Sequence, residues 1–164
     1  MTVLGFDAGI TGACTIIIDG KHHTTIDYSI DPQTGYLDRT KLLKDIRDNA
    51  SSIDAIALEK QFNPNNKPQK GMWTNAVNYG ILISVVQDIK PKAYEEVDSK
   101  VWQTFFRVKG SSKAVIAQRA IDRGFKKELA KGVRGGLKHG RTDSYLIGLY
   151  FHNMVEFRIK RSKK

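Results

Sequence analysis

The sequence has 164 residues, a formal net charge of +10 at pH 7, and 40% hydrophobic and 27% charged residues. A chain of this length forms one ordinary domain, and this composition excludes a disordered chain and a membrane span. The single cysteine, Cys14, excludes an internal disulfide framework. The first seven residues end in the acid Asp7 and lack the charged leader of a secretory signal. We therefore expect a cytoplasmic protein without a membrane partner.

Basic charge is concentrated in the second half of the chain. Residues 1–89 hold 8 basic and 10 acidic side chains (net −2), whereas residues 90–164 hold 19 and 7 (net +12). Such a region attracts the phosphates of a polyanion, although charge alone does not distinguish DNA, RNA and an anionic membrane surface. We predict a nucleic-acid partner, and the alternative is a merely solvated basic surface.

Three strands are predicted at the start of the chain. Asp19-Gly20 is a strong two-residue turn signal, so the second and third strands form an antiparallel hairpin. The three strands cover Thr2–Phe6, Ala13–Ile18 and His23–Ile30.

Helices and further strands alternate in the rest of the chain. We predict helices over Leu37–Arg47, Met72–Ile89, Ser99–Phe106, Ser112–Arg123 and Arg141–Phe157, and strands over Ile53–Leu58 and Ala93–Val97. Loops are predicted over residues 62–70 and 126–140, the second of them mobile, and residues 158–164 form a frayed basic tail. The pattern predicts a single α/β domain over residues 1–157. In it a three-strand antiparallel meander and two parallel strands form one mixed five-stranded sheet, with helices on both faces.

The predicted helix over residues 72–89 is apolar on more than one side, which is wider than a single core-facing stripe needs. The surplus apolar surface indicates a contact with a second copy of the chain. We interpret Trp73 in this helix, and Trp102 in the next one, as packing groups.

Two acids end apolar strands. Asp7 follows the first predicted strand, and Glu59 follows the strand predicted to end at Leu58. The carboxyl ends of central strands form the crevice in which open α/β sheets bind ligands. We expect both acids at this edge, and the alternative is that each caps its strand in solvent.

Asp143 lies on the apolar face of the last helix. The residues of that face follow it at spacings of 3, 4, 7, 8 and 11, and they are Leu146, Ile147, Tyr150, Phe151 and Met154. A carboxyl group there must be protonated, paired or bound to a metal ion, because isolated burial of its charge is costly. Arg141 or Lys138 could pair it.

His139 precedes Asp143 by 4 residues and could ligate a metal ion, accept a proton or cap the helix. Oxygen-rich sites favour Mg²⁺ or Mn²⁺, and the sequence has no cysteine and histidine spacing typical of zinc. Three convergent acids beside a basic surface fit phosphodiester hydrolysis with two metal ions.

With these residues the sequence resembles the RuvC-type Holliday-junction resolvases of the RNase H-like superfamily. Residues 5–12 (GFDAGITG) look like the family's opening motif, an acid at the end of the first strand followed by a glycine turn. Residues 59–62 (EKQF) are similar to its acid-x-x-Phe segment, and residues 142–146 (TDSYL) to its final acidic helix. The motifs follow in the family's order over nearly the whole chain.

The resemblance implies an RNase H-like fold, a homodimer and Mg²⁺-dependent cleavage of four-way or branched DNA by paired nicks, with Mn²⁺ as a substitute. It also implies that Asp7, Glu59 and Asp143 hold the metal ions. Phe62 matches the residue that stacks or wedges at the opened junction centre, and the alternative is an ordinary loop-anchoring aromatic. A small, lysine-rich member suits a bacteriophage or other virus, acting inside a bacterial or infected cell.

Four basic residues are candidate DNA contacts. Lys113 falls where the family has a DNA-contacting lysine, and Lys100, Lys138 and Arg141 belong to the same basic half. Lys138 ends a glycine- and lysine-rich stretch that could contact a junction arm.

Position 140 departs from the family's pattern. Many members carry a second acid one turn before the last one, where this chain has Gly140. Some members use a histidine in this region, so the resemblance assigns His139 to the fourth catalytic position.

Other functions fit part of the same residues. The first motif also resembles a phosphate-binding turn of actin-like ATPases and sugar kinases, but 164 residues are too few for their two lobes. A basic module could bind branched DNA without cutting it. A nuclease of the same fold could instead act on a flap or an RNA:DNA hybrid, which a monomeric state would favour.

Overall fold

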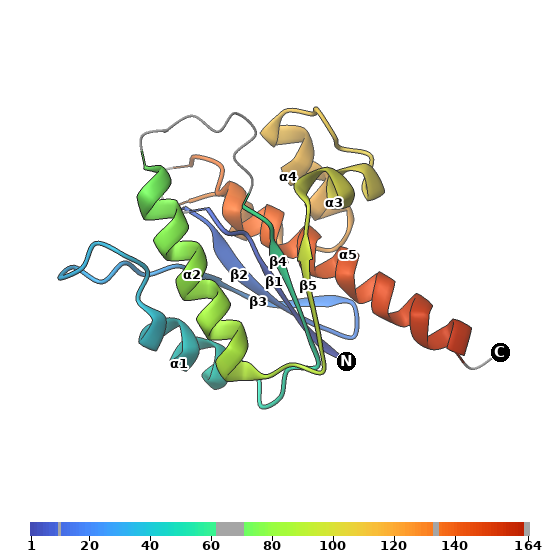
Figure 1. The fold of residues 1–164 in the computed structure, drawn as a ribbon. Helices are drawn as coiled ribbons and strands as arrows, with labels where there is room; N and C mark the ends of the chain where they lie inside the picture. The colour runs from blue at the N-terminus through green and yellow to red at the C-terminus, as the bar shows by residue number, and fades with distance from the viewer. Residues whose placement is uncertain (10, 62–70, 133–134, 163–164) are drawn as a thin grey trace.

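The computed structural model describes residues 1–9, 11–61, 71–132 and 135–162, and its centre is a five-stranded sheet (Figure 1). The strands are β1 (Thr2–Phe6), β2 (Ala13–Ile18), β3 (Lys21–Asp27), β4 (Ala55–Glu59) and β5 (Ala93–Val97). They lie in the order β3-β2-β1-β4-β5. The first three are antiparallel neighbours, and β4 runs parallel to both β1 and β5. The predicted mixed sheet is confirmed.

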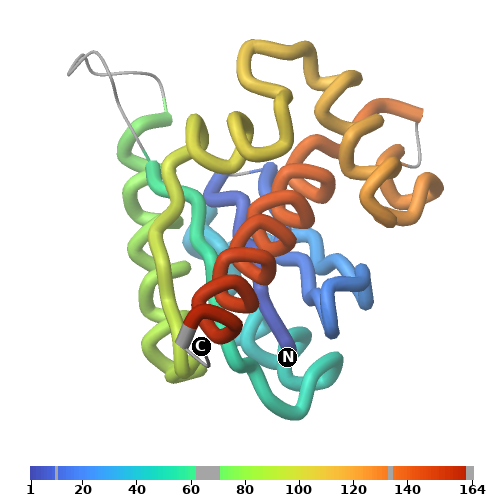
Figure 2. Tube along the Cα trace, turned by 90° about the vertical axis from the view of Figure 1, so that its right-hand side faces the viewer, coloured from blue at the N-terminus to red at the C-terminus, as the bar shows by residue number. Residues whose placement is uncertain are grey.

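Helices cover both faces of this sheet, as predicted. They are α1 (Arg39–Asn49), α2 (Met72–Ile89), α3 (Ser99–Phe105), α4 (Lys113–Asp122) and α5 (His139–Ser162), with a 3₁₀ turn η1 (Lys127–Ala130). One core joins α1 and α2 to Leu4 and Ile56, and a second core joins α3, α4 and α5 to Val3 and Ala57 on the other face. Figure 2 shows α2 and α5 on opposite sides of the strands. None of the helices in the described residues has the length and hydropathy that a membrane crossing requires.

The predicted bounds of the third strand are wrong. β3 starts at Lys21 because Asp19 and Gly20 alone complete the turn, with φ angles of 49° and 75°, and Lys21 already pairs with Ile18. β3 ends at Asp27, three residues short of Ile30.

The stretch over residues 126–140, predicted to be a mobile loop, contains regular structure in its described part. It contains η1 and a β-bridge between Lys131 and Leu137, and α5 already begins at His139. At its other end α5 continues past Phe157 to Ser162, where a frayed tail is predicted.

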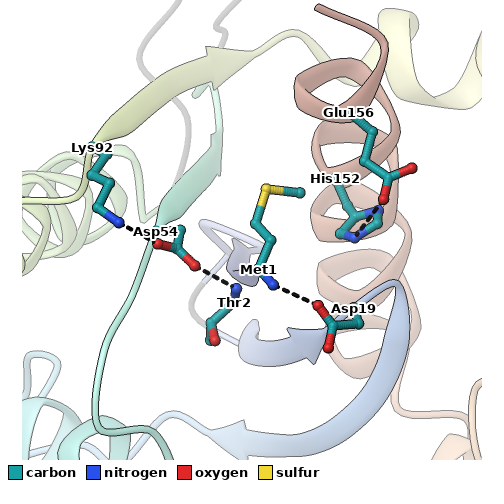
Figure 3. Close-up of polar contacts among 7 residues, drawn as sticks. All are labelled: Met1, Thr2, Asp19, Asp54, Lys92, His152 and Glu156. Atoms are coloured by element: carbon teal, nitrogen blue, oxygen red, sulfur yellow. Dashed lines mark hydrogen bonds and ion pairs between the residues drawn. The ribbon is translucent and has the colours of Figure 1, made fainter. Parts of the chain in front are cut away.

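Hydrogen bonds and ion pairs stabilise the end of the sheet at which β1 begins (Figure 3). The backbone N–H of Thr2 donates to Asp54 at 2.9 Å, and Asp54 pairs with Lys92 at 2.8 Å, which ties β1 to the segments before β4 and β5. On α5 the buried His152 lies 3.9 Å from Glu156 (Nε2 to Oε1). These contacts lie at the end of the sheet opposite to the one where β1 and β4 finish.

Candidate active site

Asp7 and Glu59 lie side by side at the carboxyl edge of the sheet. Asp7 follows the last residue of β1, Glu59 ends β4, and these parallel neighbours pair Phe6 with Leu58. Neighbouring strands are about 4.8 Å apart. Their carboxyl groups interact through a side-chain hydrogen bond that shifts the pKa of each group.

Asp143 reaches the same edge because two glycines let α5 touch the sheet. A Cβ added to Gly5 would lie 2.1 Å from the carbonyl oxygen of Ser144 and 2.5 Å from the backbone nitrogen of Gly148. The backbone of α5 therefore rests directly on β1. This contact at Ser144 holds Asp143, the residue before it, near Asp7. Burial and then the charge of Asp7 raise the pKa of Asp143.

All three carboxyl groups are half-buried, and their pKa values are raised. The pKa of Glu59 is raised to about 8 and that of Asp143 to about 7, by burial first and by the charge of Asp7 second. Burial is also the largest cause of the raised pKa of Asp7. The interpretation that Asp7 and Glu59 merely cap their strands in solvent is therefore wrong.

Neutral hydrogen-bond donors hold the two strand-end acids. The backbone N–H of Gly9 donates to Asp7 Oδ1 at 3.1 Å, and the hydroxyl of Tyr28 donates to the Asp7 carbonyl oxygen at 2.8 Å. The indole N–H of Trp102 donates to Glu59 Oε1 at 3.0 Å. These donors fix the acids without adding a positive charge.

Lys113 and His139 complete the cluster. Lys113, the first residue of α4, lowers the pKa of both Asp7 and Asp143. Burial, followed by the charge of Lys113, lowers the pKa of His139, which favours the neutral ring. Within the described residues, His139 Nδ1 is buried without a hydrogen-bond partner. A neutral ring of this kind can accept a proton.

Arg141 points away from Asp143. Its guanidinium forms a two-pronged ion pair with Asp27, with Nε to Oδ1 and Nη2 to Oδ2 both at 2.7 Å. Lys138 likewise acts on the pKa of Asp27. The interpretation that Arg141 or Lys138 pairs Asp143 is therefore wrong, and the cation beside Asp143 is Lys113.

A cavity of about 770 Å³ opens beside the cluster at the start of α5. Its lining includes Thr11, Gly12, Tyr28, Lys138, His139 and Arg141. Gly140 packs on the turn between β1 and β2: a Cβ there would lie 2.5 Å from the Thr11 carbonyl oxygen. Since any side chain at position 140 would collide with this backbone, the glycine is required by packing.

The other predicted site residues lie apart from the acids or are not described. Lys100 is exposed in the first turn of α3, and Phe62 lies outside the described residues. Trp73, interpreted as a packing group, is 73% exposed in the first turn of α2, so it does not pack in the core of the single chain. Trp102 is buried, as expected of a packing group, but it also binds Glu59.

The donor set fits a hard divalent cation. It consists of carboxyl oxygens, the ligands that Mg²⁺ prefers, and a cation would offset the burial that raises all three pKa values and the charge of Asp7 that further raises those of Glu59 and Asp143. In the side-chain positions described, no three His, Cys, Asp or Glu residues yet form a group that could hold a metal ion.

Sequence reasoning missed Trp102 and Tyr28 as neighbours of the acids. Both acids lie at strand ends, so the residues that follow adjacent strands are the places to look. β5 pairs Val97 with Glu59, and Trp102 comes soon after Val97. Tyr28 directly follows the last residue of β3. This signal requires the strand order, which a single sequence does not provide.

No protein-family model matches this chain, and no curated protein matches it. Two solved structures of RuvC from Thermus thermophilus are similar to it. One, in complex with a Holliday junction substrate, has a TM-score of 0.62 and 13% identity over 94% of this chain and 96% of its own. The other has a TM-score of 0.63 and 15% identity over 95% and 97%. The chain has the RNase H-like fold seen in RuvC, with its mixed five-stranded sheet.

Proposed function

We propose that this protein is a Mg²⁺-dependent endonuclease that resolves four-way or branched DNA junctions. The observation that carries the proposal is the convergence of Asp7, Glu59 and Asp143, three half-buried acids whose pKa values are all raised by burial, with the charge of Asp7 further raising those of Glu59 and Asp143. Strongly raised pKa values of this kind cluster at functional sites, where burial and neighbouring charges are arranged for chemistry. The fold similarity to a RuvC bound to a Holliday junction, and the +10 charge of the chain, support DNA as the substrate.

The residues have distinct roles in this proposal. Asp7, Glu59 and Asp143 would hold the divalent cations, with Mn²⁺ able to replace Mg²⁺. When bound, two such ions supply Lewis-acid activation of the attacking water and of the leaving 3′ oxygen. His139, whose pKa burial lowers and whose Nδ1 has no hydrogen-bond partner among the described residues, would accept the proton of that water. Lys113 would hold the phosphate beside the acids.

DNA would approach along the basic half of the chain. The exposed Lys100 and Lys138 remain candidates for phosphate contacts, and Phe62 remains a candidate for stacking at the junction centre. Arg141 is a weaker candidate, because Asp27 already occupies its guanidinium. Residues 158–164 would add phosphate affinity that is independent of sequence.

A symmetric junction needs two active sites, so the active form would be a homodimer. α2 buries Asn78, Leu82, Val85 and Val86 against the rest of the domain, yet Met72 and Trp73 at its start are 42% and 73% exposed. This exposed apolar end of α2 supports a contact with a second copy.

The experiment offers the purified protein four labelled substrates: a four-way junction, a linear duplex, a flap and an RNA:DNA hybrid, each with Mg²⁺ or EDTA. Symmetric nicks in the junction with Mg²⁺ alone are expected, from a dimer by light scattering. If a monomer cut the flap or the hybrid, that nucleic acid would be the substrate in place of the four-way junction. Tight junction binding without cutting would make the protein a binding module instead.

A further inference from the structure

Trp102 combines nearly complete burial with one polar contact to an acid of the site. Its side chain is 1% exposed and belongs to the core that α3, α4 and α5 form against the sheet. Its indole N–H, the group's single donor, is 3.0 Å from Glu59 Oε1. A phenyl ring at this position would fill part of the same core without donating a hydrogen bond, so the indole adds a polar contact to the packing.

The position of this indole follows from the sheet. β4 and β5 are parallel and pair Glu59 with Val97, and the ladder continues with Lys60 N donating to the Val97 carbonyl oxygen at 2.8 Å. Asp98 then caps α3 by accepting from the backbone N–H of Lys100 at 2.8 Å. The chain after Val97 is therefore fixed directly beside Glu59.

The indole is also held more firmly than the carboxylate. Phe106 N donates to the Trp102 carbonyl oxygen at 3.1 Å, so the backbone of Trp102 is fixed by the end of α3. A buried ring in a packed core keeps one rotamer, whereas the half-buried Glu59 side chain can rotate. The carboxylate therefore takes its orientation from the indole.

We propose that Trp102 is a positioning residue: its N–H fixes Glu59 Oε1 and thereby presents the carboxylate for a divalent cation. This inference rests on the proposed function. Glu59 has a second neighbour in the Asp7 carboxyl group, whose charge and hydrogen bond raise the pKa of Glu59 after burial does. A neutral donor suits the task, since Arg or Lys in its place would hold the same oxygen but repel the cation. Residues that orient ligands in this way typically change metal affinity by about 10–100-fold when removed.

The test measures Mn²⁺ affinity by calorimetry on the full-length protein without DNA. Trp102→Phe keeps most of the packing and removes the donor, and Trp73→Phe is the matched control because Trp73 is 73% exposed. In the Trp73→Phe background, replacing the remaining tryptophan by its benzothienyl analogue removes the N–H with almost no change of shape. This second variant decides the question if Trp102→Phe folds poorly.

We expect the dissociation constant for Mn²⁺ to rise about 10–100-fold in both Trp102 variants and to stay unchanged in Trp73→Phe. The half-saturating Mg²⁺ concentration for cleavage should rise by the same factor, while the junction dissociation constant measured in EDTA does not move. Unchanged Mn²⁺ affinity in the benzothienyl protein would overturn the positioning role. A wild-type protein that binds Mn²⁺ but cuts no DNA would overturn the proposed function alone, and one that binds no Mn²⁺ would overturn both.

Discussion

Gly5 of β1 and Gly148 of α5 touch backbone to backbone: a Cβ on Gly5 would lie 2.5 Å from the Gly148 nitrogen. This contact sets the height of α5 above the sheet and therefore the distance from Asp143 to Asp7. The geometry of the acid cluster thus depends on two residues that carry no functional group.

Replacing Gly5 by Ala should push α5 away from β1. Overpacking of this kind costs about 1–3 kcal/mol, so the free energy of unfolding in urea should fall by that amount, and Mn²⁺ affinity should fall with it. Gly80→Ala is the control, because a Cβ on this exposed residue of α2 meets no atom of the described residues within 4 Å. That change should stabilise the protein by about 0.5–1 kcal/mol. Equal changes in the free energy of unfolding for Gly5→Ala and Gly80→Ala would contradict the close contact between β1 and α5.

Glu59 makes stability depend on pH when divalent cations are absent. Its pKa is raised to about 8, whereas an unfolded Glu titrates near 4.5. The folded state therefore binds the proton more tightly, and stability is lost as the pH rises from about 4.5 to 8. Glu59→Gln keeps an acceptor for Trp102 and cannot ionise. At pH 8 in EDTA it should be more stable than the wild type by about 1–3 kcal/mol, after allowance for solvent screening of this half-buried group.

The difference between Glu59→Gln and the wild type should shrink as the pH approaches 4.5, and added Mg²⁺ should narrow it at pH 8. Urea denaturation at several pH values measures both effects. A Gln variant that is less stable than the wild type at pH 8 would show that the ionised Glu59 is not under repulsion.

Replacing Lys113 and Arg141 in turn should distinguish a side chain that binds phosphate from one that stabilises the fold. Lys113 is exposed, so Lys113→Ala should leave the unfolding free energy within about 0.5 kcal/mol but reduce the salt dependence of junction binding by about one phosphate contact. Arg141→Ala breaks the 2.7 Å pair with Asp27 and should cost about 1–2 kcal/mol of stability with little change in the salt slope. Binding titrations at several salt concentrations distinguish them, and the reverse pattern would contradict the assignment.

The regular elements were predictable from the sequence where local patterns decide them. The bounds of α2 and β5 match the predictions, and the turn at Asp19-Gly20 sets the β2–β3 hairpin. The end of α5 was not predictable, because the apolar stripe stops near Phe157. The helix continues on pairs such as Glu156 and Lys160, 3.5 Å apart, which a search for apolar faces ignores.

The acids were easier to find than the residues that position them. Asp7, Glu59 and Asp143 are conspicuous because each is an acid in an apolar element. Trp102 is an aromatic among apolar neighbours, which is ordinary in a sequence, and its contact with Glu59 exists only through the pairing of β4 with β5. Such contacts depend on register and require the folded structure.

The cleavage rate of a labelled four-way junction in Mg²⁺, compared between the wild type and Asp7→Asn, tests the central claim most directly. Junction binding in EDTA is measured beside it, and Asp48→Asn, an exposed acid of α1 paired with Lys44, is the matched control. We expect Asp7→Asn to lose cleavage by about 1,000-fold or more, because a ligand of the cation contributes several kcal/mol to the transition state, and to keep junction affinity nearly intact. Asp7→Asn that cuts at the rate of the wild type would contradict the account.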